Sequence, residues 1–298
     1  MSNNIHYTAC PVCGSASVQF AVSVKDHSVS KEEFPVWQCA GCSLRFTQDV
    51  PDAAAIGPYY QSEDYISHTN TSKGLVNKLY QFVRKRTMNG KRKLVSRETG
   101  LDKGTLLDIG SGVGSFAATM KEHNWNVTGL EPDAGAREVA KKTYSIELES
   151  IDKLFQLPAN SFDAITMWHV LEHVHNLQAY IAQLKTLLKE NGRLLIAVPN
   201  YTAKDAAIYK EFWAAYDVPR HLYHFSPNSI KTLVERHGMN VKKYKPMWYD
   251  SFYISLLSSK YKNGKSNLIA AFFNGLRSNI NAIGNPQKCS SVIYIIGK

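Results

Sequence analysis

The sequence predicts a doubly wound α/β fold preceded by a small cysteine-rich module. Three observations support this prediction. From Thr105 onward, short apolar runs alternate with helical patterns, as in a parallel sheet whose strands are joined by helices. A glycine-rich turn directly follows the first of these runs. Ahead of them, two Cys-x-x-Cys pairs have the spacing of a structural metal site.

The composition is that of a folded protein with a basic surface. Of 298 residues, 44% are hydrophobic and 20% are charged, which excludes extensive disorder. The longest apolar runs, such as Leu268–Phe273, fall far short of the roughly 18 residues that cross a bilayer. Met1–Cys10 lacks the basic start and apolar core of a secretory signal. We therefore expect a soluble, cytoplasmic protein with no membrane span.

Much of the net charge of +10 lies between Lys73 and Lys103. In this segment only Glu98 and Asp102 oppose the basic residues. Such a block would attract phosphates of nucleic acid, of a nucleotide-sugar or of an anionic lipid surface. Apolar residues such as Leu75 and Leu79 recur at helical spacing, so a solvated amphipathic helix explains the same pattern. Both interpretations stay open.

Four of the five cysteines are predicted to hold one structural zinc ion. Two residues between thiolates let one tight turn present both sulfurs to one ion, and two such turns complete a tetrahedron. Val18–Val24 and Phe34–Trp37 have the pattern of short strands, as in a zinc ribbon. Disulfides would need an oxidising compartment and a redox pair would need a βαβ context, so both are disfavoured. Cys289 is expected to be an inert thiol. The expected zinc ligands are Cys10, Cys13, Cys39 and Cys42.

Three segments are predicted along the chain. Residues 1–50 form the zinc ribbon, and residues 51–103 form an aromatic and basic helical linker or lid. Residues 104–298 form the α/β domain, with a helical insertion at about 248–290. Tyr59–His68 and Trp248–Tyr253 are candidates for closing over a bound ligand, although plain packing explains aromatic residues equally well. The expected strands of the α/β domain are Thr105–Ile109, Asn126–Leu130, Phe162–Trp168, Arg193–Val198, Val241–Tyr244 and Ser291–Ile296. The expected helices are Ser115–His123, Asp133–Lys142, a stripe from Leu177 to Leu188 that Asn191-Gly192 closes, and Ser229–Gly238.

The glycine-rich turn predicts a cofactor that carries a ribose. Gly110-Ser111-Gly112-Val113-Gly114 ends the first strand, and glycine lets the backbone turn sharply and admits a ligand without a Cβ in the way. Glu131 closes the second strand, where it can accept both hydroxyls of a ribose. Ser115 stands where a dinucleotide fingerprint has its third glycine. A G-x-G-x-G loop suits a cofactor with no pyrophosphate.

With Asp108 inside the strand, this loop resembles motif I of the class I S-adenosylmethionine-dependent methyltransferases. Glu131-Pro132-Asp133 is similar to the acidic residue that this family has after its second strand, and Asn191–Ile196 resembles the turn into its fifth. The resemblance covers about residues 100–247 and the last strand. It implies a seven-stranded Rossmann-like sheet and S-adenosylmethionine as cofactor. The implied cofactor-binding residues are Asp108, Gly110, Ser111, Gly112, Gly114, Glu131, Pro132, Met167 and Trp168.

Four residues are expected on the acceptor side of the cofactor: His169, Glu172, His173 and His221. The first three directly follow the strand Phe162–Trp168, at the edge where doubly wound sheets bind ligands. His221 comes from the long connection after the strand Arg193–Val198. A histidine is well matched to removing a proton from a hydroxyl acceptor near neutral pH. Histidines that only pack at strand ends are the alternative.

Two known patterns bear on these residues. They resemble the E-x-x-E-H motif and downstream His of ubiquinone-biosynthesis and small-RNA 2′-O-methyltransferases, which can hold a divalent ion. In this chain His169 replaces the first Glu of that motif. His169–His173 also spells H-x-x-E-H, a zinc-protease pattern, but here it leaves the end of a parallel strand rather than lying within a long helix. A protease is therefore disfavoured.

The order of a zinc ribbon followed by a methyltransferase resembles a bacterial group linked to polysaccharide or sugar modification. The sequence thus predicts S-adenosylmethionine-dependent O-methylation of a small-molecule or saccharide acceptor, with or without a phosphate group. An RNA methyltransferase is the second hypothesis, because the basic block suits phosphates. No aromatic-interleaved platform accompanies that block, so a nucleic-acid partner is not favoured. A non-catalytic scaffold that binds S-adenosylmethionine is the hypothesis from another class.

Overall fold

The computed structural model describes residues 4–61 and 75–298, with the side chains of residues 75–85 outside the description. Most of the predicted lid segment Tyr59–His68, and the basic and apolar side chains expected before residue 86, therefore lie outside the described residues. The described chain forms two units. The first unit holds residues 4–61, 171–178 and 197–294, and the second holds 75–170, 179–196 and 295–298.

The centre of the second unit is a parallel set of three strands. The strands are β6 (Thr105–Ile109), β7 (Asn126–Leu130) and β8 (Phe162–Trp168). β6 pairs in parallel with β7 on one side and β8 on the other, and its residues 106–109 are buried. The chain thus leaves β6 for one neighbour and later crosses to the other, which is a doubly wound path. All three strands have their predicted bounds.

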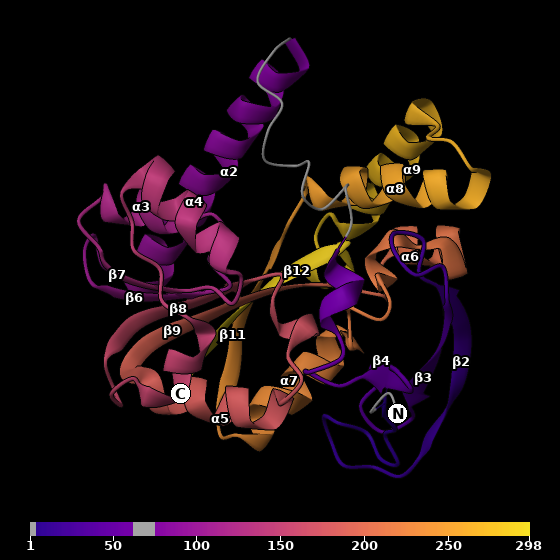
Figure 1. Ribbon diagram of the computed structural model, residues 1–298, viewed down its shortest axis with the longest axis horizontal. Helices are drawn as coiled ribbons and strands as arrows, with labels where there is room; N and C mark the ends of the chain where they lie inside the picture. The colour runs from indigo at the N-terminus through magenta and orange to yellow at the C-terminus, as the bar shows by residue number, and fades with distance from the viewer. Residues whose placement is uncertain (1–3, 62–74) are drawn as a thin grey trace. The chain divides into compact units, whose positions relative to one another are not determined.

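Helices precede, connect and follow these strands. They are α2 (Leu75–Thr99), α3 (Ser115–Lys121), α4 (Ala134–Tyr144) and α5 (Leu177–Leu187). α3 and α4 lie on one side of the strands and α5 lies on the other (Figure 1). Asp133 caps α4 by accepting a hydrogen bond from the Ala136 amide at 2.6 Å, which is why this helix starts one residue later than predicted.

The full sheet has the order β11-β12-β9-β8-β6-β7 (Figure 1). Its other strands are β9 (Leu188–Pro199), β11 (Asn240–Pro246) and β12 (Ser291–Gly297). The predicted turn at Asn191-Gly192 is wrong, because these residues lie within β9. Extended backbone begins directly after α5, and the carbonyls of Thr186 and Leu187 at the end of that helix accept hydrogen bonds from the amides of Asn160 and Ser161.

The predicted doubly wound fold is confirmed, but its strand number is wrong. The sheet has six strands in the described part of the chain, not seven. Beside β7, Glu149 forms a single parallel bridge with Leu130, and its amide donates to the Gly129 carbonyl at 2.9 Å. The next residue, Ser150, caps the 3-10 helix η2 (Ile151–Gln156). The segment that could have become a seventh strand therefore ends after one bridge.

The first unit contains a four-stranded antiparallel sheet. Its order is β10-β4-β3-β2, with β2 (Val18–Lys25), β3 (Glu33–Cys39), β4 (Arg45–Thr47) and β10 (Tyr223–His224). Trp37 pairs with Phe46, and Phe46 pairs in turn with Tyr223. A separate pair joins β1 (Asn4–Ile5) to β5 (Val50–Pro51). The cysteine-rich module thus shares a sheet with residues far along the chain.

Helices complete the first unit. One apolar core in it gathers Val36 from β3, Trp213, Tyr216 and Ile254.

The domain boundaries expected at residues 50 and 103 stay predictions. No described helix is long and apolar enough to cross a bilayer. The helices of this unit are η1 (Gly57–Tyr60), η3 (Leu171–His173), α6 (Lys204–Tyr209), η4 (Lys210–Phe212), η5 (Ala214–Tyr216), α7 (Pro227–Arg236), α8 (Asp250–Asn263), α9 (Leu268–Ala282) and η6 (Pro286–Lys288).

Candidate functional site

The three glycines of the loop after β6 have different structural tasks. Gly110, Gly112 and Gly114 have φ of 68°, 54° and 77°, the left-handed region that favours glycine. A Cβ on Gly110 would overlap the side chain of Val170, and one on Gly114 would lie 2.9 Å from the Cβ of Ala140. These two glycines allow close packing. A Cβ on Gly112 would meet no atom within 4 Å, so this glycine leaves open space of the kind a ligand needs.

Glu131 is held against this open space by the loop itself. Its Oε2 accepts a hydrogen bond from the Gly112 amide at 2.8 Å, and its Oε1 accepts one from the Asp133 amide at 3.0 Å. Burial raises the pKa of this carboxyl, and the two amides oppose that effect. Each carboxylate oxygen can accept a further hydrogen bond, as two ribose hydroxyls would require.

Asp108 lies beneath the loop and joins two strands. Its buried carboxylate accepts a hydrogen bond from Thr166 Oγ1 of β8 at 2.7 Å. Burial raises the pKa of Asp108 to about 6, even though the Thr166 hydroxyl lowers it. Ser111 Oγ donates to the Asp108 carbonyl at 2.8 Å and fixes the start of the loop. Asp108 and Ser111 therefore shape the loop from below.

Lys91, which the sequence analysis counted only as part of a basic block, interacts with two residues near the loop. Its ammonium lies over the Trp168 ring, 4.4 Å from the ring centroid, and its charge lowers the pKa of Asp108. Phe116 of α3 contacts the same ring edge to face at 5.5 Å. The sequence held a signal for Lys91. On a helix, residues three and four apart lie on one face, so Lys91 shares the face of Leu94 and Val95, and both of these are buried.

Two further residues predicted to bind the cofactor complete this region. Met167 is buried within β8, directly before Trp168. Pro132 is exposed, and its carbonyl accepts a hydrogen bond from Arg137 Nη1 at 2.8 Å, as the Glu131 carbonyl does at 2.6 Å. Arg137 therefore braces the backbone on which Glu131 stands.

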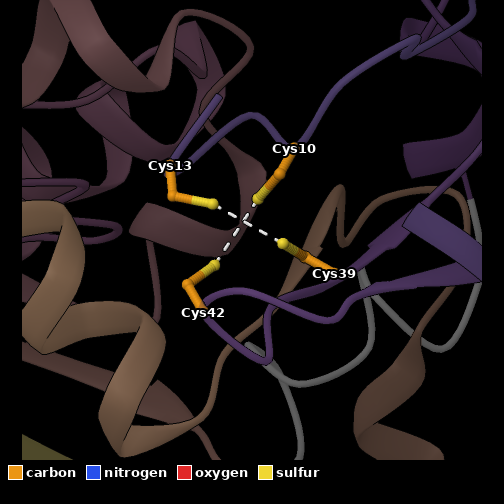
Figure 2. A group of neighbouring side chains, drawn as sticks. All are labelled: Cys10, Cys13, Cys39 and Cys42. Carbon is orange, nitrogen blue, oxygen red and sulfur yellow. Dashed lines mark hydrogen bonds between the residues drawn. The ribbon is translucent and has the colours of Figure 1, made fainter. Parts of the chain in front are cut away.

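The four predicted zinc ligands converge in the first unit. Figure 2 shows the sulfurs of all four cysteines pointing toward a common centre. Cys10 Sγ and Cys42 Sγ are 3.5 Å apart, as are those of Cys13 and Cys39, and ligand atoms of all four lie within 4.8 Å of one another. A disulfide would need about 2.05 Å between sulfurs. A tetrahedral zinc ion with bonds of about 2.3 Å places its sulfurs about 3.8 Å apart, so this donor set fits the ion.

A second cluster in the first unit combines Glu172, His173 and His221. One ligand atom from each lies within 4.8 Å of the others, and the two imidazole rings meet edge to face at 4.6 Å. Glu172 is fully buried. Burial and the neighbouring His221 ring lower the pKa of His173 to about 4, so this imidazole is uncharged at neutral pH.

Backbone carbonyls fix the proton positions on both rings. Nδ1 of His173 lies 3.0 Å from the Arg220 carbonyl, and Nδ1 of His221 lies 2.8 Å from the Ala215 carbonyl. Because a carbonyl only accepts, each Nδ1 carries a hydrogen. The pKa of His173 is lowered to about 4, so its Nε2 keeps a lone pair at neutral pH, and an imidazole in this state can accept a proton or bind a metal ion.

Arg220 supports this cluster, and the sequence analysis did not single it out. Its Nη2 donates to Asp26 Oδ1 at 2.9 Å and to Asp217 Oδ1 at 2.7 Å, and its Nη1 donates to the Tyr59 carbonyl at 2.8 Å. Burial alone would raise the pKa of Asp217, but the guanidinium lowers it below its usual value. Arg220 thus holds the backbone carbonyl that orients His173.

The structure brings together three of the four residues expected on the acceptor side. His169 belongs to the other unit and follows β8 with φ of 58°, a conformation rare outside glycine. That all four residues line one acceptor site stays a prediction, as do the individual roles assigned to the cofactor-binding residues.

Comparisons with known proteins agree with the loop and its sheet. A family model described as a methyltransferase domain matches residues 81–244. A ubiquinone biosynthesis O-methyltransferase of Rickettsia canadensis is 26% identical over 170 residues, which cover 53% of this chain and 72% of the relative. A demethylmenaquinone methyltransferase of Tropheryma whipplei is 27% identical over 119 residues, which cover 39% of this chain and half of the relative. A solved structure of a SAM-dependent methyltransferase from Archaeoglobus fulgidus has 22% identity and a TM-score of 0.46, covering 73% of this chain and 98% of that chain.

The family model covers more than half of this chain. The chain therefore belongs to the methyltransferase domain family, as a class I S-adenosylmethionine-dependent enzyme. The prediction of such an enzyme is confirmed. S-adenosylmethionine also fits the structure, since the loop leaves open space at Gly112 beside the Glu131 carboxylate.

Substitutions at the loop are expected to weaken cofactor binding. Gly112→Val fills the open space, and Glu131→Ala removes the carboxylate that the loop holds in place. Each should weaken S-adenosylmethionine binding by roughly 10-fold or more in a calorimetric titration. Gly264→Val is the control, because Gly264 has φ of 75° and equally open surroundings but follows α8. Wild-type affinity in both loop variants would contradict the assignment.

Proposed function

We propose that this enzyme methylates a hydroxyl group of a small molecule. The observation that carries the proposal is the cluster of Glu172, His173 and His221, in which the neutral imidazole of His173 keeps a lone pair on Nε2. A hydroxyl is a weak nucleophile until its proton leaves, and this nitrogen offers a place for that proton. The chain reaches this cluster within a few residues of the end of β8.

The residues divide the work of the reaction between them. S-adenosylmethionine supplies a methyl group on a sulfonium sulfur, and the glycine loop with Glu131 would hold it. Nε2 of His173 would take the proton from the acceptor hydroxyl. The oxygen would then attack the methyl carbon, and the bond from that carbon to sulfur would break to leave S-adenosylhomocysteine. Glu172 would stabilise the imidazolium that forms. The Arg220 carbonyl holds the His173 ring in the tautomer that this task requires.

An aromatic hydroxyl is the acceptor class that we favour. One relative is named a ubiquinone biosynthesis O-methyltransferase and another a demethylmenaquinone methyltransferase, and these names point to quinone-type ring acceptors. A phenolic hydroxyl has a pKa near 10, so its proton passes to an imidazole more readily than that of a sugar hydroxyl. A saccharide acceptor is the second candidate, and methylation of RNA is a further outcome of the same test.

A divalent metal ion at the same cluster is a second candidate mechanism. The specific observation is that a carboxylate and two imidazoles bring ligand atoms within 4.8 Å of one another. This mixed donor set fits a first-row divalent ion. Glu172, His173 and His221 would hold the ion, which would supply a positive charge that lowers the pKa of the acceptor hydroxyl.

Methyl transfer to a catechol tests the proposed reaction. Wild-type enzyme should convert S-adenosylmethionine to S-adenosylhomocysteine with simple catechols, and mass spectrometry should find the methyl group on oxygen. His173→Ala should lower turnover by roughly 10²-fold or more and leave cofactor affinity nearly unchanged. The exposed His123, replaced by Ala, serves as the control.

Two further arms decide between the mechanisms. Activity lost to a chelator and restored by magnesium or manganese, with zinc content unchanged, would favour the metal version. Full turnover in His173→Ala and His221→Ala variants would refute both versions. Methylation of RNA without methylation of catechols or sugars would overturn the small-molecule proposal.

We further propose that Cys10, Cys13, Cys39 and Cys42 bind a structural zinc ion. Support comes from the convergence of four free thiols at distances that suit zinc and not a disulfide. A site with four cysteine ligands leaves no open position, so its ion would stabilise the fold and take no part in the chemistry.

Elemental analysis is expected to find one zinc ion per chain. Cys39→Ser should lose the metal and destabilise the first unit, because metal binding energy at such sites is folding energy. Hydrogen exchange should then speed up in β2, β3 and β10, while β6 and β8 stay protected. Cys289→Ser is the control, since this buried thiol lies outside the cluster. Normal stability of a metal-free wild type would contradict the proposal.

A further inference from the structure

Helix α9 presents its large apolar side chains to solvent. Leu268, Ile269 and Phe273 are 71%, 72% and 62% exposed, and Ile283 just beyond the helix is 72% exposed. A helix on a protein surface normally turns such residues toward the core and its polar residues outward. A contiguous exposed apolar surface of this kind marks a site of interaction.

The face of α9 that packs on the protein consists of small residues. Its buried residues include Ala271, Gly275 and Ser278, and they face a helix α8 whose buried residues are mostly serines. A Cβ on Gly275 would lie 2.8 Å from Phe252 Cδ1 and 3.1 Å from the Ser251 carbonyl oxygen, so the two helices approach closely. Packing through small residues, with large apolar residues outside, is the pattern of helices in contact with lipid.

Hydrogen bonds fix this orientation of α9. Ser278 Oγ donates to the buried carboxylate of Asp205 at 2.7 Å, and Asn279 Nδ2 donates to the Trp248 carbonyl at 2.8 Å. Asn274 Nδ2 donates to Tyr209 Oη at 3.0 Å. Rotating the helix to bury its apolar face would break all three bonds and leave a buried carboxylate without one of its donors, which is costly.

The surroundings of this face carry positive charge and interfacial aromatic residues. From Asp250 to Lys288 the chain has that one acidic residue and several basic ones, of which Lys260, Lys262 and Lys265 are exposed next to the start of α9. Trp248, Tyr249 and Tyr253 are partly exposed near the start of α8. Aromatic residues of this type concentrate at membrane–water interfaces, and lysines attract anionic headgroups.

We propose that the α8–α9 pair binds the surface of an anionic lipid membrane, with the apolar face of α9 in the boundary between headgroups and acyl chains. α9 has 15 residues and is thus about 22 Å long, shorter than the roughly 30 Å hydrocarbon core. It would therefore lie along the interface and not cross it. A second copy of the chain would place basic surface against basic surface, which disfavours it as the occupant. The proposal goes beyond methyl transfer and does not depend on the acceptor.

Vesicle flotation of the full-length protein tests the proposal without measuring turnover. Wild type should float with vesicles of phosphatidylcholine and phosphatidylglycerol in equal parts, and much less with phosphatidylcholine alone or at high salt. The double substitution Ile269→Gln with Phe273→Gln should weaken binding by roughly 10-fold or more, because each side chain would bury apolar surface in the lipid. Lys262→Glu with Lys265→Glu should weaken binding to the anionic vesicles alone.

Phe20→Gln is the matched control, because Phe20 of β2 is 59% exposed in the same unit and should not affect binding. Wild type that stays in solution with both kinds of vesicle would overturn the proposal. So would a concentration-dependent dimer that Phe273→Gln dissociates, since a second copy would then cover the face. Either result leaves the methyltransferase assignment untouched, because flotation reads membrane partition only.

Discussion

The buried side chain of Arg220 is the interaction on which the first unit depends. Its guanidinium is 4% exposed and pairs with Asp26 at 2.9 Å and with Asp217 at 2.7 Å. Removing one partner from such a buried pair costs about 3–5 kcal/mol, because a charge is left without compensation. Asp26 follows β2 in the cysteine-rich module, and Asp217 begins the connection that carries His221. One arginine therefore ties the module to the histidine cluster.

This tie gives the cysteine-rich module a physical task. Thr47 at the end of β4 donates from its hydroxyl to the His221 carbonyl at 2.7 Å. Two residues after His221, Tyr223 of β10 pairs with Phe46 of β4. The connection that bears His221 is thus held by backbone pairing, by a side-chain hydrogen bond and by the ion pairs of Arg220. A closed metal site in the same module would contribute rigidity to this arrangement and no chemistry. In the proposed reaction the module would therefore act only by positioning.

The sequence allowed the local parts of the structure to be predicted, and the contacts between distant residues escaped it. β6, β7 and β8 have their expected bounds, because an apolar run followed by a glycine turn or a helix cap is readable within a few residues. The convergence of the four cysteines was readable for the same reason. The pairing of Asp26 with Arg220 joins residues 194 positions apart, and the missing seventh strand depends on one bridge at the sheet edge. Neither leaves a local pattern.

In the proposed reaction the cysteine-rich module would act by holding the histidine cluster, whereas the cofactor loop belongs to the other unit. An Asp26→Asn variant separates the two, because it keeps the shape of the side chain but removes one of the two carboxylates that pair with Arg220. We expect its S-adenosylmethionine affinity to stay within about 2-fold of wild type and its single-turnover rate to fall at least roughly 10-fold on the acceptor that the wild type methylates. A wild-type rate in this variant would rule out the positioning role of the module.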